Sequence, residues 1–271
     1  MLMRQCRLIS RLALFGFALL ICSLIAGAVS IIEWLIRRDI DRTPFARFCF
    51  ATAAHCLGFR VHQQGRVEQG PVLLVSNHIS WSDIPILGGV VKLRFLSKIE
   101  VRNWPVIGWL AAQAGTLFIR RGGGQARMTR DTIAETLASG QSVLVFPEGT
   151  TSVGITVLPF HSRLLSAAQE AGVPIQPISI GYRRSGHPDH LAPFIGDDIF
   201  QSHLLRLLRE PAVEVIVTMH APVKIRTEDD LSSVTCRIQQ TIQQGLSAIH
   251  SSADDRSGKP AEPAGIHVGD T

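Results

Sequence analysis

Residues 72–83 read Val-Leu-Leu-Val-Ser-Asn-His-Ile-Ser-Trp-Ser-Asp, and this stretch decides how the chain folds. Its first four residues are apolar, with valine at both ends, which is typical of a short parallel strand buried on both faces. An imidazole and a carboxylate, His78 and Asp83, follow the strand at a spacing of five residues. A carboxylate that holds a histidine in one tautomer is the usual means of taking a proton from a hydroxyl near neutral pH. The stretch therefore predicts a buried strand with a proton-transfer site at its carboxyl end.

The spacing of this pair is weak evidence by itself. His250 and Asp255 repeat it in the polar C-terminal region, and a pair at this spacing is expected by chance in a chain with ten histidines. The alternative interpretation of His78 is a histidine at the start of a helix, with Asp83 as an ordinary surface carboxylate. The rest of the chain has to separate the two interpretations.

Short apolar segments alternate with helical patterns, which predicts the α/β class, a mostly parallel sheet flanked by helices. In open sheets of this kind, ligands bind outside the carboxyl ends of the strands. Because His78, Arg120 and Glu148 each follow a predicted strand by one to three residues, we expect them on one rim of the sheet. This convergence favours a functional site over a chance spacing. The predicted strands are 72–76, 93–97, 116–119, 143–146, 175–180 and 213–219, and the predicted helices are 125–138, 161–171 and 227–250.

The composition permits one sizeable α/β domain and an appendage, because 271 residues suffice for a full core. The formal net charge of +5 suits an anionic membrane surface or an acidic carrier protein, and it is too diffuse to indicate nucleic-acid binding. The five cysteines form no CxxC pair and no zinc-type spacing. We therefore expect reduced thiols, a cytosol-facing location and no bound metal.

The N-terminal region carries a run of 21 uncharged residues, 12–32, which is long enough to cross roughly 30 Å of hydrocarbon. A secretory signal peptide is the alternative, because Arg4, Arg7 and Arg11 form a basic leader. The run is longer than the apolar part of such a peptide and lacks a clean cleavage site after it, so we favour a membrane anchor. A second apolar stretch at 45–59 is too short to span easily and is predicted to be an interfacial helix.

The chain is thus expected to divide into three parts. Residues 1–62 form the anchor, with an apolar helix at 12–36 and the interfacial helix at 45–59. Residues 63–250 form the α/β domain, and the Ser/Asp/Gly/Pro-rich residues 251–271 are expected to be a disordered tail. Basic residues flank the apolar run on both sides, so its pattern leaves open whether the helix spans the bilayer or dips into one leaflet.

Four blocks within residues 70–182 stand out by their order. They are Asn-His-x4-Asp at 77–83, Gly-Thr-Leu-Phe-Ile-Arg-Arg at 115–121, Phe-Pro-Glu-Gly-Thr at 146–150 and Val-Pro-Ile-Gln-Pro-Ile at 173–178. In this order they resemble the motifs of the glycerolipid acyltransferase family, whose members acylate lysophosphatidate and related lysolipids. Any one block is weak evidence, whereas four in the family's order are strong.

The resemblance implies a membrane-bound O-acyltransferase with a His–Asp dyad. His78 would be the general base that takes the proton of the acceptor hydroxyl, and Asp83 would orient its ring. The hydroxyl of a lysolipid would then attack an acyl thioester directly, with acyl carrier protein or coenzyme A as carrier of the acyl group and no other cofactor. Backbone N–H groups of a helix that begins after Asn77 would stabilise the oxyanion.

Two other classes compete with this interpretation. A serine hydrolase would need a Gly-x-Ser-x-Gly elbow, which the sequence lacks. A membrane-anchored lipid-binding protein without chemistry would keep the head-group site but lose the dyad, whereas both His78 and Asp83 are present.

The resemblance also places the acceptor site. Arg120 is the cation expected at the acceptor's anionic head group, and two solvated arginines at a strand end are the alternative interpretation. Glu148 is expected to hydrogen-bond the acceptor or to organise nearby cations, and Gly149 permits a tight turn after the strand. The expected substrate-binding residues are Asn77, Arg120, Arg121, Glu148, Gly149 and Thr150.

Two positions depart from the family pattern. Thr151 stands where the family commonly has arginine, and His161 stands where a lysine often follows the phenylalanine. Both missing groups are cations that would bind a phosphate. The segment 148–160 instead looks like the branch that acylates lyso-ornithine lipid, and this similarity continues through 176–182 and 192–197.

The resemblance therefore favours lyso-ornithine lipid as the acceptor and a role in ornithine lipid biosynthesis. A 1-acyl-sn-glycerol-3-phosphate acyltransferase, which makes phosphatidic acid, is the alternative, and one enzyme with both activities is compatible with the motifs. The implied location is the inner, cytoplasmic membrane, with the catalytic domain facing the cytosol.

Overall fold

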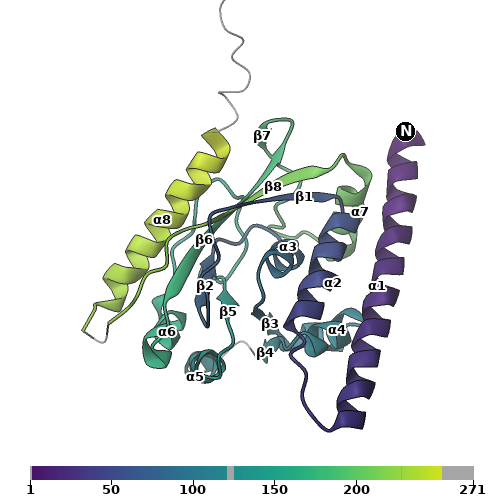
Figure 1. The fold of residues 1–271 in the computed structure, drawn as a ribbon. Helices are drawn as coiled ribbons and strands as arrows, with labels where there is room; N and C mark the ends of the chain where they lie inside the picture. Colours follow the sequence, from purple (N-terminus) through teal and green to yellow (C-terminus); the bar gives the residue numbers. More distant parts are fainter. Residues whose placement is uncertain (1, 121–124, 227, 252–271) are drawn as a thin grey trace, which may run out of the picture.

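A computed structural model describes residues 2–120, 125–226 and 228–251. Within these ranges the chain forms an eight-stranded sheet with helices on both faces (Figure 1). The strands follow the order β1-β8-β6-β2-β5-β3-β4 across the sheet, and β7 pairs with β6. Their bounds are β1 Phe59–Gln64, β2 Leu73–Ser76, β3 Arg94–Lys98, β4 Leu117–Ile119, β5 Val143–Val145, β6 Ile175–Arg184, β7 His187–Pro188 and β8 Val213–Met219.

Most neighbouring strands run parallel, as the sequence predicts. β2 pairs in parallel with β5 and β6, β3 pairs in parallel with β5 and β4, and β1 pairs in parallel with β8. In the described part of the chain, the antiparallel pairs are β6 with β8 and β6 with β7. The α/β class is therefore confirmed, and each predicted strand is present.

The edge strand β1 is not evident from the sequence, and it lies across the boundary expected at 62–63. The predicted interfacial helix ends earlier than residue 59, as α2 (Thr43–Cys56). Gly58 then turns the chain with a φ of 90°, and Phe59 begins the strand. Phe59 alone of this strand is buried, and the residues after it are half-buried or exposed. Its polar residues therefore carry no alternation that would predict a strand.

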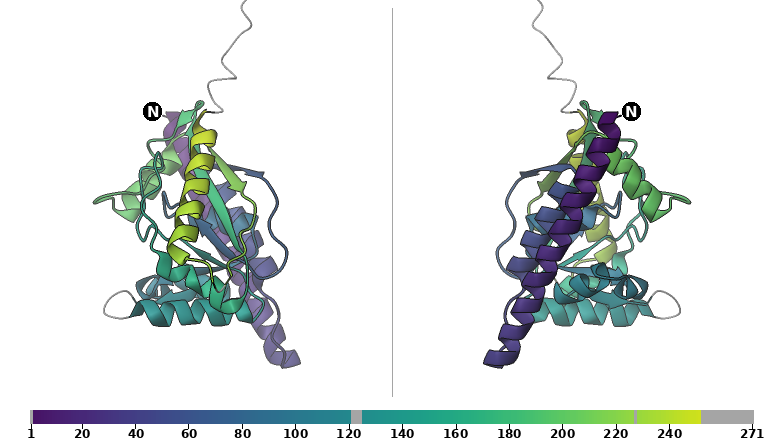
Figure 2. Two further views of the ribbon diagram at one scale, coloured as in Figure 1. Left: turned by 90° about the vertical axis from the view of Figure 1, so that its left-hand side faces the viewer. Right: turned by 90° about the vertical axis from the view of Figure 1, so that its right-hand side faces the viewer.

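Two helical layers cover the sheet (Figures 1 and 2). Toward one face lie α1 (Leu2–Ile36), α2, α3 (Asp83–Val90), α4 (Ile107–Gln113) and α7 (Phe200–Arg209), and toward the other lie α5 (Gln125–Ala138), α6 (Ser166–Ala171) and α8 (Leu231–Ser251). The helix predicted at 161–171 is divided into a short 3₁₀ helix, Ser162–Leu164, and α6.

The strand β2 contributes to the cores on both faces, because successive strand residues point to opposite sides. Leu74 packs with residues of α2, α3 and α7, whereas Leu73 and Val75 pack with residues of α5, α6 and α8. All three side chains are fully buried. Burial on both faces explains why the residues before the His–Asp motif form a continuous apolar run.

The helix α1 is, within the described ranges, long and apolar enough to cross a membrane by length and composition. Few of its side chains are buried, and large apolar ones such as Phe17 and Leu24 are exposed. The helix runs along the edge of the domain beside α2 (Figure 2). Its exposed apolar face suits contact with lipid.

Both ends of α1 nevertheless bond to the α/β domain. Near the N-terminal end, Arg11 donates a hydrogen bond to the carbonyl of Glu210, just past α7, at 2.8 Å. Near the C-terminal end, Ser30 donates to the side chain of Gln113 in α4 at 3.4 Å. The basic leader of the sequence is thus engaged by the domain.

Candidate active site

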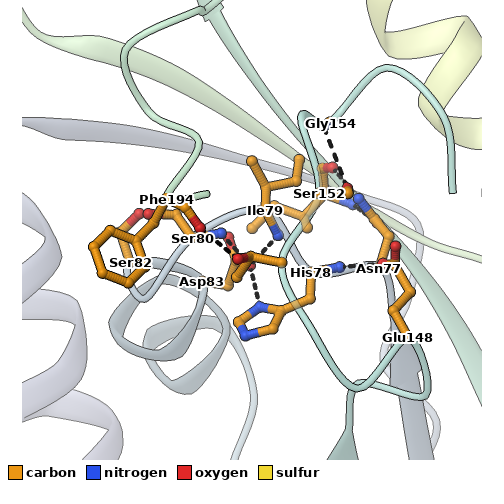
Figure 3. Close-up of polar contacts among 12 residues, drawn as sticks. Asn77, His78, Ile79, Ser80, Ser82, Asp83, Glu148, Ser152, Gly154 and Phe194 are labelled. Atoms are coloured by element: carbon orange, nitrogen blue, oxygen red, sulfur yellow. Dashed lines mark hydrogen bonds and ion pairs between the residues drawn. The ribbon is translucent and has the colours of Figure 1, made fainter. Parts of the chain in front are cut away.

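The His–Asp turn, residues 77–83, connects the carboxyl end of β2 to the start of α3 (Figure 3). The Nδ1 atom of His78 lies 2.7 Å from Oδ2 of Asp83, so the proximity predicted from the sequence is confirmed. The Asp83 side chain is fully buried, whereas 19% of the His78 side chain is exposed. The same Oδ2 atom accepts hydrogen bonds from the backbone N–H groups of Ile79 at 2.7 Å and Ser80 at 3.0 Å. The carboxylate thus closes the turn around itself and faces the imidazole.

The His78 ring is held in one plane and favours one tautomer. It stacks on Phe146, which follows β5, with ring centroids 4.0 Å apart and an angle of 13° between the planes. A carboxylate oxygen beside Nδ1 favours the proton on that nitrogen, which leaves Nε2 as the basic atom of the neutral ring. Within the described ranges, no protein group forms a hydrogen bond with Nε2. The ring therefore presents its lone pair on the side away from Asp83.

Tyr182 completes the surroundings of the carboxylate. Its hydroxyl lies 2.5 Å from Oδ1 of Asp83 and donates to it, and the Ser82 hydroxyl lies 2.9 Å from the same oxygen of Tyr182. Burial, and then the adjacent charge of Asp83, raise the pKa of Tyr182 well above its usual value, so this hydroxyl stays a proton donor. The sequence offered one signal for it. Tyr182 is the only tyrosine of the chain, and a buried tyrosine hydroxyl usually has a partner.

Glu148, on the loop after β5, holds the His–Asp turn through hydrogen bonds. Its Oε1 atom accepts a hydrogen bond from the backbone N–H of His78 at 2.6 Å, and its Oε2 atom accepts one from Leu158 at 2.9 Å. The backbone N–H of Ser152 donates to the carbonyl of His78 at 2.8 Å. Burial raises the pKa of Glu148, and the two N–H donors oppose that shift. The loop after β5 therefore holds both polar backbone groups of His78, and the predicted contact of Glu148 with the acceptor stays a prediction.

Asn77 ties the turn to the neighbouring strand β6. Its side-chain amide donates to the carbonyl of Ile180 and accepts from the N–H of Ile180, both at 2.9 Å. The residue is fully buried. Both ends of the amide are therefore engaged in holding β2 and β6 together, and a contact with substrate stays a prediction.

The expectation that N–H groups just after Asn77 stabilise the oxyanion is wrong. The helix α3 begins only at Asp83. The N–H groups of His78, Ile79 and Ser80 already donate to the carboxylates of Glu148 and Asp83. These groups order the turn and have no hydrogen left for a substrate oxygen.

The remaining acceptor residues lie at the edge of the site. Gly149 and Thr150 are exposed, and Gly149 adopts a φ of 70°, a left-handed conformation that favours glycine. Arg120 is exposed at the end of β4, which is three strands away from β2 in the sheet order, or roughly 14 Å at the usual strand spacing. The expected rim therefore brings His78 and Glu148 into contact and leaves Arg120 at a distance. Arg121 lies outside the described residues.

The two positions that depart from the family pattern also lie in this region. The Thr151 hydroxyl donates a hydrogen bond to the carbonyl of Phe194. His161 is exposed, and its ring lies beside Gly149, because a Cβ atom added to that glycine would be 3.5 Å from the ring. Neither side chain supplies a permanent cation. In the described ranges, no group of three or more His, Cys, Asp or Glu side chains is arranged to hold a metal ion.

Comparison with known proteins gives a consistent result. The model of the acyltransferase family matches residues 58–181. The chain is 46% identical to the lyso-ornithine lipid O-acyltransferase of Pseudomonas aeruginosa, over 91% of this chain and 93% of that protein. It is 34% identical to the lyso-ornithine lipid O-acyltransferase of Brucella abortus, over 83% of this chain and 91% of that protein.

More distant relatives carry a different name. The 1-acyl-sn-glycerol-3-phosphate acyltransferase of Neisseria gonorrhoeae is 28% identical over 71% of this chain and 76% of that protein. The crystal structure of the 1-acyl-sn-glycerophosphate (LPA) acyltransferase from Thermotoga maritima has a TM-score of 0.64 and 24% identity, covering 90% of this chain and 97% of that one. This structural likeness supports the fold alone. The identity and coverage of the closer relatives go further, and they show that the chain belongs to the acyltransferase family.

Proposed function

We propose that this protein is a membrane-bound O-acyltransferase that transfers a fatty acyl group from a thioester to the free hydroxyl of lyso-ornithine lipid. The observation that carries the chemistry is the 2.7 Å contact between Nδ1 of His78 and the buried carboxylate of Asp83. This contact leaves Nε2 available as a general base. The alternative of a lipid-binding protein without chemistry predicts a degraded dyad, and the intact geometry of the pair speaks against it.

The proposed reaction proceeds in two steps without an acyl-enzyme. Nε2 of His78 takes the proton of the acceptor hydroxyl while the oxygen forms a bond to the thioester carbonyl carbon. The C–S bond of the resulting tetrahedral intermediate then breaks, and the leaving thiolate takes the proton back from Nε2. The products are an ester and a free thiol. Asp83 stabilises the imidazolium between these steps, because its negative charge lies beside Nδ1 in a buried site.

The choice of acceptor is supported by the relatives. Proteins named lyso-ornithine lipid O-acyltransferase match this chain at up to 46% identity, whereas the 1-acyl-sn-glycerol-3-phosphate acyltransferase of Neisseria gonorrhoeae matches at 28%. The missing cations at Thr151 and His161 also favour a head group other than phosphate. The second candidate, acylation of lysophosphatidate, is favoured by Arg120, the cation expected at an anionic head group, which is exposed at the end of β4.

The donor and the location are part of the proposal. The acyl group would come from acyl carrier protein or coenzyme A, and the formal net charge of +5 suits either of these acidic partners. Reduced thiols and a thioester substrate suit the cytosolic side of the inner membrane.

The contacts of α1 favour insertion into one leaflet. Arg11 and Ser30 are 19 residues apart, so they lie roughly 28 Å apart along the helix, close to the thickness of the hydrocarbon core. Both bond to the same α/β domain, at Glu210 and Gln113. A helix that crossed the bilayer would separate these partners onto opposite sides of the membrane.

The test is acyl transfer by the purified protein in detergent, with labelled acyl carrier protein and either lyso-ornithine lipid or lysophosphatidate. The label is on the fatty acyl group of the acyl carrier protein, so we expect labelled lipid product with lyso-ornithine lipid and none from the His78→Ala variant. Product with lysophosphatidate alone would replace the acceptor, and product with both would mean that the missing cations relax specificity. Full activity of His78→Ala, in protein that remains folded and membrane-bound, would disprove the mechanism. No product from either acceptor, repeated with acyl coenzyme A, would leave the lipid-binding alternative.

A further inference from the structure

His203 is a fully buried histidine on α7 whose ring nitrogens both have partners. Its Nδ1 atom lies 3.0 Å from the indole Nε1 of Trp81, and its Nε2 atom lies 3.0 Å from the carbonyl oxygen of Pro193. An indole nitrogen can only donate, so Nδ1 must accept. A carbonyl can only accept, so Nε2 must carry the proton. The two contacts therefore fix His203 as a neutral ring in one tautomer, and burial lowers its pKa in the same sense.

Both contacts lead to the His–Asp turn. Trp81 is itself a residue of that turn. Pro193 precedes Phe194, whose backbone N–H donates to the carbonyl of Ile79 at 3.0 Å. The rings of Phe194 and His203 pack edge to face, with centroids 5.2 Å apart. His203 thus contacts the turn directly, by its hydrogen bond with Trp81, and indirectly, because Pro193 and Phe194 connect it to Ile79.

Both contacts affect the position of the Asp83 carboxylate through the backbone of the turn. The N–H groups of Ile79 and Ser80 are the ones that hold Oδ2 of Asp83, the atom that faces His78. A displacement of the turn at position 79 or 81 would therefore move the carboxylate relative to the imidazole. A misplacement of about 1 Å in a catalytic group can lower a rate on the order of a hundredfold.

The helix that carries His203 is itself fixed at its far end. Arg7 donates to the carbonyl of Arg209 and Arg11 donates to that of Glu210, both at 2.8 Å. Cationic side chains at the last carbonyls of a helix satisfy open acceptors and complement its dipole. Near its start, α7 also packs Phe200 against Trp81, with ring centroids 5.0 Å apart. The helix is therefore held between the anchor α1 and the His–Asp turn.

We propose that His203 is a positioning residue for acyl transfer, which fixes the His–Asp turn through its hydrogen bonds to Trp81 and to the carbonyl of Pro193. The inference rests on the proposed role of His78 and Asp83 as the dyad. It assigns a catalytic consequence to a residue that lies outside the sequence motifs.

The competing interpretation is that His203 only fills the core. In that case its loss would lower the free energy of unfolding and leave the rate per folded molecule unchanged. His220 offers a matched control, because it too has a pKa lowered by burial and a hydrogen bond, 2.7 Å from its Nε2 to the Ser179 hydroxyl. It lies on the loop after β8 and, within the described residues, forms no hydrogen bond to residues 77–83, whereas His203 bonds directly to Trp81. Its link to the turn is indirect, through Ser179 and the neighbouring Ile180, which bonds to Asn77.

The experiment measures kcat and KM of full-length protein in detergent, with labelled acyl carrier protein and the acceptor that the wild type uses. Trp81→Phe keeps an aromatic ring but removes the N–H group, and we expect kcat to fall by about tenfold with KM little changed. His203→Leu removes both hydrogen bonds and should lower kcat further, by up to about a hundredfold. His203→Gln retains an acceptor and a donor, so it should recover part of that loss. The double variant Trp81→Phe/His203→Leu should have a kcat no lower than that of His203→Leu alone.

Two outcomes would overturn the proposal. One is an unchanged kcat in folded Trp81→Phe and His203→Leu. The other is an equal fall of kcat in His220→Leu, which would mean that any buried histidine has the same effect. Trp81→Phe decides the question if His203→Leu does not fold. His78→Ala, assayed alongside, separates failure of the proposed dyad from failure of the proposed role of His203. An active His78→Ala variant would reject the dyad. An inactive His78→Ala variant together with a normal kcat in Trp81→Phe would reject only the role of His203.

Discussion

The two sides of this active site are built differently. At the His–Asp turn, the carboxylate of Asp83 accepts four hydrogen bonds from His78, Ile79, Ser80 and Tyr182. On the acceptor side, Arg120 and Thr150 are exposed, and no group in the described part of the chain holds the Arg120 guanidinium. The proposed chemistry is thus preorganised by buried protein groups, whereas Arg120, the residue predicted to recognise the acceptor, has a side chain that the described part of the protein does not fix.

This difference has a physical consequence. A buried polar network holds its geometry before substrate arrives, so a change within it lowers the rate of the chemical step. An exposed cation acts only when the substrate is present, so a change there alters binding.

Asp83→Asn should lower kcat on the order of a thousandfold, because a neutral amide cannot stabilise the positive charge of the His78 imidazolium. An asparagine oxygen can still accept from the N–H groups of Ile79 and Ser80, so the turn should stay folded. Steady-state kinetics together with a thermal unfolding curve check both parts. Near-normal turnover would contradict the orienting role of the carboxylate and would remove the contrast between the two sides.

Tyr182→Phe should lower kcat by roughly tenfold and the free energy of unfolding by about 1–3 kcal/mol, because Oδ1 of Asp83 and the Ser82 hydroxyl both lose a buried partner. The measurements are kcat in detergent and denaturant unfolding. A loss of stability with an unchanged kcat would mean that Tyr182 supports the core but does not position the carboxylate.

Arg120→Gln should raise KM for the acceptor by about tenfold and leave kcat and the unfolding midpoint unchanged, because an exposed charge-assisted hydrogen bond is lost only in the complex. Arg127→Gln is the matched control, since Arg127 on α5 is also exposed, with 85% of its side chain accessible. If Arg120→Gln behaves like this control, Arg120 is a solvated surface residue and the acceptor site lies elsewhere.

The stability of the protein should fall as the pH drops below about 6.5, the ordinary pKa of histidine. Burial lowers the folded-state pKa of His203 and His220, so between that lowered value and 6.5 the unfolded chain binds more protons than the folded one. Arg206 lowers and Asp198 raises the pKa of His203, and these two groups pair with each other at 3.3 Å. Unfolding midpoints of wild type and His203→Gln across this range check the effect, and parallel curves would contradict it.

Much of the framework follows from the sequence. The apolar runs at 72–76 and 143–146 predict strands because residues buried on both faces of a parallel sheet must all be apolar. The proximity of His78 and Asp83 follows from the order of the motifs along the chain, because the spacing of the pair alone is weak evidence. In the same way, the apolar stripe of 227–250 predicts α8, whose Val234, Ile238 and Ile242 are buried.

The edge strand β1 and the partners of the dyad do not follow from local patterns. Tyr182 lies 99 residues beyond Asp83 in the sequence and reaches it only because β6 is the neighbour of β2 in the sheet. His203 lies 122 residues beyond Trp81, on a helix whose place depends on packing against α1 and the sheet. Sheet order also places the carboxylate of Glu148 beside the backbone of His78, a contact that no local pattern indicates, and the expected contact of Glu148 with the acceptor stays a prediction.

The α/β class, the anchor-like α1 and the pairing of an imidazole with a carboxylate can be predicted from the chain, because each depends on short motifs and their order. The buried groups that hold this pair, and the ring nitrogen that stays without a protein partner in the described residues, are known only from the fold. The reason is that strand order and helix packing bring together side chains that no local spacing relates.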